Sequence, residues 1–165
     1  MPLIKNGAIA EDAWQFPADD APLPGQGPVA ISLERWQRER EVLQARRAPL
    51  GLLVKSDTQV EDFAADLAEF ELIALDFPTF RDGRPYSAAR LLRERHGYTG
   101  ELRAVGDVSR DQFLFMHRCG FDAFQVSSGG ALEGWLSADE VKNGGSQGIE
   151  VGPDVDMCAP LGHLR

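Results

Sequence analysis

Five short apolar runs constrain the fold of this chain more than any other feature of its sequence. Each run has four or five residues and is bounded by polar or turn-forming residues: Val29 to Leu33, Leu50 to Val54, Leu72 to Asp76, Leu102 to Val105 and Ala123 to Val126. Continuous runs of this length are typical of strands buried on both faces of a parallel sheet. We therefore expect a mainly parallel sheet of about five strands.

Sequence signals for helix starts and ends lie between these runs. Three capping boxes place Ser or Thr three residues before Glu or Gln: Thr58 with Glu61, Ser109 with Gln112, and Ser137 with Glu140. After the first box, the apolar residues at 60, 63, 64 and 67 fall on one helical face. Gly97 and Gly120 stand where a left-handed residue ends a helix before the next strand.

Alternation of strands and helices predicts right-handed β-α units and an α/β fold. A half-barrel-like curl and a doubly wound sheet are both compatible with this pattern, and the shortness of each unit favours the first. We expect one compact domain over residues 1–143, in which residues 1–15 form a hairpin turning at Asn6 and Gly7, residues 16–27 a linker, and residues 28–143 the β-α units. Residues 144–165 are expected to be a flexible tail.

The overall charge restricts the classes of partner. A formal net charge of -9 disfavours non-specific binding to nucleic acid or to acidic membrane surfaces. No stretch approaches the roughly 20 apolar residues of a membrane span, and the first residues lack the order of a signal peptide, so we expect a cytoplasmic protein. Cys119 lies among apolar residues and far from Cys158 in sequence, which favours a buried reduced thiol over a redox pair.

One segment of this acidic chain is locally basic. Between Arg81 and Arg110 there are seven arginines and only four acidic residues. A long loop over residues 77–87 leads into this segment and is followed by a helix with Arg90 on its first turn, and a short loop lies at Gly106 and Asp107. Loops after neighbouring parallel strands meet at one edge of the sheet. Arginines there can hold a small oxyanion or a phosphate by paired hydrogen bonds. The candidate ligand-binding residues are Arg81, Arg84, Ser87, Arg90, Arg103 and Arg110.

The same residues also allow a purely structural interpretation. Asp76, Asp82 and Asp107 can pair with the arginines and lock the two loops together. Arg103 lies inside an apolar run, so it requires either a buried acidic partner or a site facing the sheet edge. The candidate catalytic residues are Asp76, Tyr86 and Asp107, although the Tyr86 hydroxyl can equally be held by a structural hydrogen bond.

Metal and cofactor motifs give no further assignment. The histidines at 96, 117 and 163 lack metal-ligand spacing to a cysteine or an acid, so we predict no metal site. Ser127 to Gly130 follows a strand and can cradle a phosphate, but it lacks the glycine pattern of a dinucleotide site and is interpreted as a turn. The sequence leaves any cofactor undetermined.

Three segments, at residues 77–87, 89–95 and 100–108, resemble the bacterial family known as domain of unknown function 934. The resemblance covers roughly residues 1–126, and beyond Val126 the chain departs from the family's usual ending. Such proteins are often labelled oxidoreductases, and their genes commonly lie beside those for the sulfite reductase haemoprotein and the adenylylsulfate-type reductase. The resemblance therefore implies a place in assimilatory sulfite or sulfate reduction.

Three functions follow from combining the residues with the resemblance. In the first, an accessory protein of this pathway binds a small anion or a sulfonucleotide at the arginine-rich edge. In the second, an oxidoreductase-type enzyme has Asp76, Arg84, Tyr86 and Asp107 in its site. In the third, a docking or assembly factor uses the arginine loop to contact the haemoprotein and has no small-molecule ligand.

Overall fold

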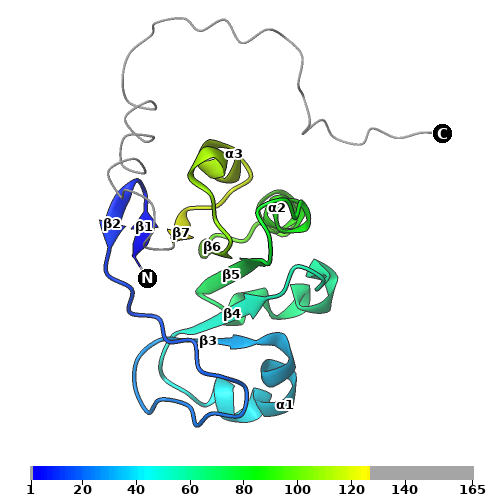
Figure 1. Ribbon diagram of the computed structural model, residues 1–165. Coiled ribbons are helices and arrows are strands. Elements are labelled where there is room, and N and C mark those ends of the chain that lie inside the picture. The colour runs from blue at the N-terminus through cyan, green and yellow to red at the C-terminus, as the bar shows by residue number, and fades with distance from the viewer. Residues whose placement is uncertain (1, 127–165) are drawn as a thin grey trace, which may run out of the picture.

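The computed structural model describes residues 2–126, which fold into one sheet with helices along one of its faces (Figure 1). The strands are β1 (Leu3–Lys5), β2 (Ala8–Ala10), β3 (Val29–Ser32), β4 (Leu50–Val54), β5 (Leu72–Phe77), β6 (Glu101–Gly106) and β7 (Ala123–Gln125). The α-helices are α1 (Leu33–Gln44), α2 (Arg84–Arg90) and α3 (Phe113–Arg118). Shorter helical segments are η1 (Val60–Asp62), η2 (Ala64–Glu69), the π-helical η3 (Leu91–Arg95) and η4 (Arg110–Gln112).

The strand order confirms the α/β fold class and favours the half-barrel-like arrangement over the doubly wound one. Within residues 2–126 the sheet has seven strands in the order β2-β1-β7-β6-β5-β4-β3, and strands β3 to β7 are parallel and in sequence order. A doubly wound sheet would reverse its strand order near the middle. The sequential order is that of a half-barrel, with each crossover returning along the same face.

The prediction of about five strands was wrong, because the N-terminal hairpin joins the sheet. It turns at Asn6 and Gly7, whose φ angles of 50° and 76° suit a tight two-residue turn. Strand β1 then pairs antiparallel with β7, placing Ile4 opposite Phe124. The hairpin therefore extends the sheet edge beyond β7.

Two predicted helix starts differ from the observed ones. After β4 the reciprocal cap lies one residue later than expected, with the backbone N–H of Gln59 donating to Asp62 at 3.3 Å. The segment forms two short 3₁₀ helices because Phe63 leaves the helical conformation and buries its ring, which is 1% exposed. At the second box, the Ser109 hydroxyl donates to Asp111 instead of accepting a helix amide. The third box and the expected tail lie outside the described residues.

The two faces of the sheet are covered differently. Helices cover one face over an apolar core that includes Trp36, Phe77 and Phe113. The segment after β2 runs along the other face (Figure 1), where the Trp14 ring packs so closely on Gly51 that an added Cβ would lie 2.9 Å from it. The expected linker over residues 16–27 is fastened to the domain by side chains, because its carbonyl groups accept hydrogen bonds from arginines at positions 35, 38 and 46.

Two expectations about the chain as a whole can be compared with the fold. None of the helices within residues 2–126 has the length and the apolar character that crossing a membrane requires. Cys119 is 3% exposed, so its expected burial is confirmed. Cys158 lies outside the described residues.

Candidate functional site

The arginine-bearing loop after β5 is shorter than expected. Helix α2 begins at Arg84, where the backbone N–H donates to Asp82 Oδ1 at 3.0 Å, and Pro85 occupies its first turn. Ser87 consequently lies inside the helix, and Arg90 ends α2 instead of lying in its first turn. Arg90 pairs with Glu94 four residues later, at 3.2 Å.

Arg84 and Asp82 form a two-pronged ion pair at this edge of the sheet. Arg84 Nε donates to Asp82 Oδ1 at 2.9 Å and Nη2 donates to Oδ2 at 2.6 Å. The Asp82 side chain is 8% exposed, whereas that of Arg84 is 61% exposed. The Arg84 guanidinium is the main cause that holds the pKa of Asp82 well below its ordinary value, and the Ser56 hydroxyl adds to the effect. The pair joins the end of the loop after β5 to the first residue of α2, so it does not link the loops after β5 and β6.

A small cleft opens beside this pair, between the loop after β4 and helix α2. It has a volume of roughly 150 Å³, and its lining includes the hydroxyl-bearing residues Ser56, Thr58 and Ser87, together with Arg84 and one acidic residue, Glu61. An adjoining hollow of roughly 10 Å³ shares Ser56, Thr58 and Arg84 and extends to Asp76. Hydroxyl groups and a guanidinium lining one cleft can together donate hydrogen bonds to an oxyanion.

Asp76, near the carboxyl end of β5, is a half-buried acid without a bonded partner among the described residues. No other group in residues 2–126 forms a hydrogen bond or an ion pair with its carboxylate. Burial, and then the nearby charge of Asp82, raise the pKa of Asp76 above its ordinary value. Of the three candidate catalytic residues, Asp76 is the one whose carboxylate is not committed to a structural contact.

The other two candidates hold the neighbouring loops in place. The Asp107 carboxylate accepts a hydrogen bond from the backbone N–H of Phe80 at 3.0 Å, and so links the two loops through a backbone amide. The Tyr86 hydroxyl donates to Gln112 Oε1 at 2.8 Å, and Gln112 donates in turn to the Phe80 carbonyl at 2.9 Å. Burial raises the pKa of Tyr86 to about 12, which disfavours its loss of a proton near neutral pH. Arg81 and Arg110 form no ion pair within residues 2–126.

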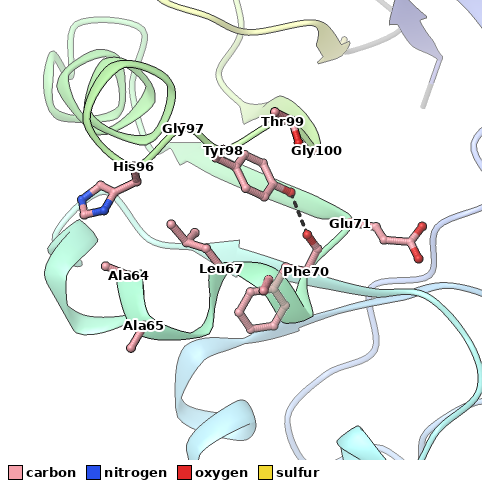
Figure 2. Close-up of a pocket in the computed structure, with 11 residues that line it drawn as sticks. Ala64, Ala65, Leu67, Phe70, Glu71, His96, Gly97, Tyr98, Thr99 and Gly100 are labelled. Atoms are coloured by element: carbon pink, nitrogen blue, oxygen red, sulfur yellow. Dashed lines mark hydrogen bonds between the residues drawn. The ribbon is translucent and has the colours of Figure 1, made fainter.

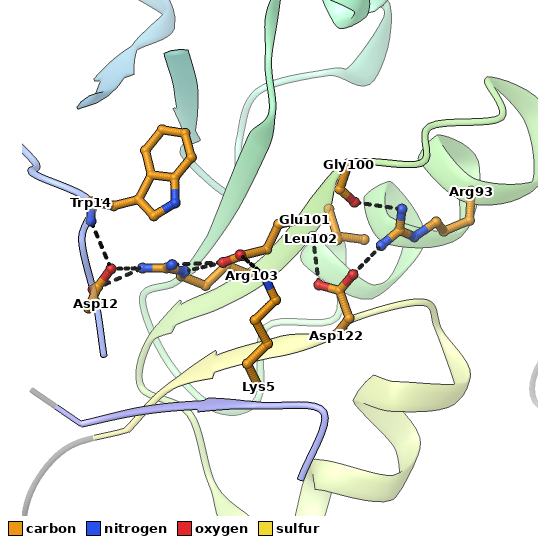
Figure 3. Close-up of polar contacts among 9 residues, drawn as sticks. All are labelled: Lys5, Asp12, Trp14, Arg93, Gly100, Glu101, Leu102, Arg103 and Asp122. Carbon is orange, nitrogen blue, oxygen red and sulfur yellow. Dashed lines mark hydrogen bonds and ion pairs between the residues drawn. The ribbon is translucent and has the colours of Figure 1, made fainter. Parts of the chain in front are cut away.

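Arg103 lies in a different place from the other candidates. It faces the side of the sheet opposite the helices, and its side chain is 1% exposed (Figure 3). Its Nη1 donates to both carboxylate oxygens of Asp12 at 2.9 Å, and its Nη2 lies 2.7 Å from Glu101 Oε1. Glu101 also pairs with Lys5 at 2.7 Å. Of the two environments expected for Arg103, the structure has the buried ion pair.

A further hollow was missed by the sequence analysis. It lies at the amino end of the strands, between η2 and the loop before β6, and has a volume of roughly 680 Å³ (Figure 2). The Tyr98 hydroxyl donates to the Phe70 carbonyl at 3.1 Å in its wall, and the buried Nε2 atom of His96 has no hydrogen-bond partner among the described residues. Small side chains of η2, including Ala64 and Ala68, leave the space open.

Comparison with known proteins supplies a family. The model of a family described as a bacterial protein of unknown function, DUF934, matches residues 51–143, more than half of the chain. The chain belongs to this family. The match contains the three segments on which the resemblance rested, omits the N-terminal hairpin, and continues past Val126, where the sequence analysis expected a departure. No curated protein and no solved structure matches the chain.

The DUF934 match covers β4 to β7 and therefore both loops of the carboxyl edge. Asp12, which pairs with Arg103, lies outside the match. No group of three or more histidine, cysteine, aspartate or glutamate side chains within residues 2–126 is arranged to hold a metal ion.

Proposed function

We propose that this DUF934 protein is an accessory protein of assimilatory sulfite or sulfate reduction that binds a small oxyanion at the carboxyl edge of its sheet. The pathway follows from the family resemblance, and the ligand class follows from the chemistry of the edge. One observation supports the ligand class above all: Arg84 and three hydroxyl groups line the same cleft of roughly 150 Å³. Sulfite, sulfate and the sulfate group of a sulfonucleotide are all recognised by such donors.

Asp82 has a defined part in this proposal. Its carboxylate occupies two donors of Arg84, through Nε and Nη2, in the geometry that an oxyanion would use. The carboxylate therefore competes with the ligand for the guanidinium. A bound oxyanion either displaces Asp82 or uses the remaining donors of Arg84 with the hydroxyls of Ser56 and Thr58. The reductases of the pathway are the proposed recipients of the bound ligand.

Thermal unfolding of the full chain with sulfite, sulfate, phosphate or adenylyl sulfate tests the proposal. A ligand at about 100 times its dissociation constant adds roughly 2.7 kcal/mol, or about 5–10 °C for a chain of this size. We expect this shift to disappear in Arg84→Ala and to increase in Asp82→Asn, where the competing carboxylate is removed. Arg47→Ala is the matched control, because Arg47 is exposed and precedes β4, whereas the cleft lies beyond the other end of that strand.

The pattern across the variants separates the cleft from a general charge effect. If anions act only through the total charge of the chain, Arg47→Ala and Arg84→Ala will reduce the shift equally. Absence of a shift with all four anions in the wild-type chain would refute the proposed ligand class.

A further inference from the structure

Three large apolar side chains are exposed at the same edge of the sheet. Phe80 is 41% exposed, Leu114 40% and Phe115 38%. Phe115 packs against Tyr86 with ring centroids 4.9 Å apart, and the Tyr86–Gln112 hydrogen bond leads directly to the Phe80 backbone. We call these three side chains, with Arg81 and Arg110, the rim patch. Exposed apolar side chains that are grouped together mark interaction surfaces more often than apolar side chains scattered singly do.

We propose that the rim patch is a docking surface for an acidic protein segment that carries aromatic or aliphatic anchor side chains. This inference does not depend on the anion cleft, because it uses Arg81 and Arg110 and not Arg84. The partner is defined by its chemistry: apolar groups that cover Phe80 and Phe115, and carboxylates that reach the arginines beside them.

The charges around the patch support an acidic partner. Arg81, Arg110 and Arg118 are exposed and form no ion pair within residues 2–126. The carboxylates of Asp107 and Asp111 lie nearby and accept hydrogen bonds from the Phe80 amide and the Ser109 hydroxyl, but neither pairs with these arginines. The three exposed arginines therefore outnumber these two carboxylates, on a chain whose formal net charge is -9.

The patch is also held in place before any partner arrives. The Phe80 backbone is fixed from both sides, because its N–H donates to Asp107 and its carbonyl accepts from Gln112. The Arg81 guanidinium lies over the Phe80 ring, 5.3 Å from its centroid. A surface whose backbone is already fixed loses less conformational entropy on binding than a mobile loop does.

Nuclear magnetic resonance on the isotopically labelled full chain tests the proposal with defined probes. The first probe is a synthetic dodecapeptide of glutamate with two tryptophans and two leucines. The second replaces those four residues with serine, and the third replaces glutamate with lysine. We expect saturable shifts of the amide signals of Phe80, Arg110 and Phe115 with the first probe only. Equal shifts with the second probe would reduce the interaction to charge alone and overturn the proposal.

Matched variants assign the binding to particular groups. We expect Phe115→Ala to weaken binding of the first peptide by about tenfold, and Arg81→Glu combined with Arg110→Glu to weaken it at least as much. Val42→Ala controls for loss of an exposed apolar side chain, since Val42 is 64% exposed on α1. Arg47→Glu controls for charge reversal. Arg84→Ala should leave peptide binding unchanged, so failure of this proposal and failure of the anion proposal are distinguishable.

Two further measurements identify a different occupant. Sedimentation equilibrium of the full chain would show a dimer that Phe115→Ala dissociates if a second copy covers the patch. Nuclear Overhauser contacts from the Phe115 ring to residues 127–165 would show that the chain covers its own patch. Either result would overturn the proposal, as would the absence of binding by the first peptide.

Discussion

The two arginine-containing regions of this protein differ in how completely their charges are paired. On the face of the sheet opposite the helices, Arg103 is buried and is bonded to both Asp12 and Glu101, and Glu101 also pairs with Lys5 (Figure 3). At the carboxyl edge, Arg84 is 61% exposed, and neither Arg81 nor Arg110 forms an ion pair within residues 2–126. Arginine thus fastens the fold in one region and lies exposed at the surface in the other.

Removal of the Arg103 side chain is the strongest way to test this contrast. Arg103→Met leaves the carboxylates of Asp12 and Glu101 without their shared buried partner, so we expect a loss of about 3–5 kcal/mol of unfolding free energy. Urea denaturation followed by circular dichroism measures it. Arg81→Met, the edge counterpart, should change the unfolding free energy by no more than about 0.5 kcal/mol.

Equal effects of the two substitutions would remove the distinction between the regions. Replacement of Asp12 by Asn provides a second measurement if Arg103→Met does not fold, because it weakens the same pair from the exposed side. If the urea midpoint of Asp12→Asn equals that of the wild type, the segment after β2 contributes little to the stability of the sheet.

A smaller effect is expected where a paired charge is only partly buried. Asp122 accepts the Leu102 amide at 2.9 Å and pairs with Arg93 Nη2 at 3.0 Å, which joins the end of the α2–η3 helix to strand β6 (Figure 3). Asp122→Ala removes both contacts and should cost about 1.5–3 kcal/mol of unfolding free energy. Asp122→Asn keeps an acceptor for the Leu102 amide, so its loss of unfolding free energy should be smaller. An equal loss in both variants would show that the hydrogen bond to the amide contributes no stability of its own.

The strands were predictable from sequence because each continuous apolar run is buried on both faces. Every observed parallel strand lies within one residue of the predicted run at each end. The start of α2 was missed although its signal was present, since Asp82 and Pro85 are a capping acceptor and a first-turn residue. The strand count was wrong because nothing local shows that a hairpin at the N-terminus pairs with β7.

The candidate site was predictable only where it depends on local sequence. Loops after neighbouring strands do meet, and the Asp107 contact to Phe80 follows from that. The partner of Arg103 could not be predicted in this way, because Asp12 is separated from Arg103 by 91 positions. The hollow beside Tyr98 was hidden for the same reason, because its two walls come from residues 64–71 and 96–100, which only the packed sheet brings together.

Among these predictions, substitution of Asp76 should change the unfolding free energy least, and the change should depend on pH. Its pKa is raised by burial and by Asp82, so the folded chain keeps the proton to higher pH than the unfolded chain does. Stability contributed by this group is therefore lost as the pH rises through the ordinary carboxyl range and beyond it. The unfolding free energy of Asp76→Asn should exceed that of the wild type by less than about 1 kcal/mol at pH 7, and this difference should vanish near pH 3.

Unfolding curves of wild type and Asp76→Asn across this pH range measure the difference, with the exposed Asp57→Asn as the control. A constant difference at every pH would mean that the carboxylate of Asp76 is as well solvated in the folded chain as in the unfolded one. A difference that grows with pH, and that shrinks when Asp82→Asn is added, would show that the edge keeps an acid at a cost to stability. Around Arg103, in contrast, each buried charge has an ion-pair partner, so the corresponding carboxylates are not left without a counter-charge.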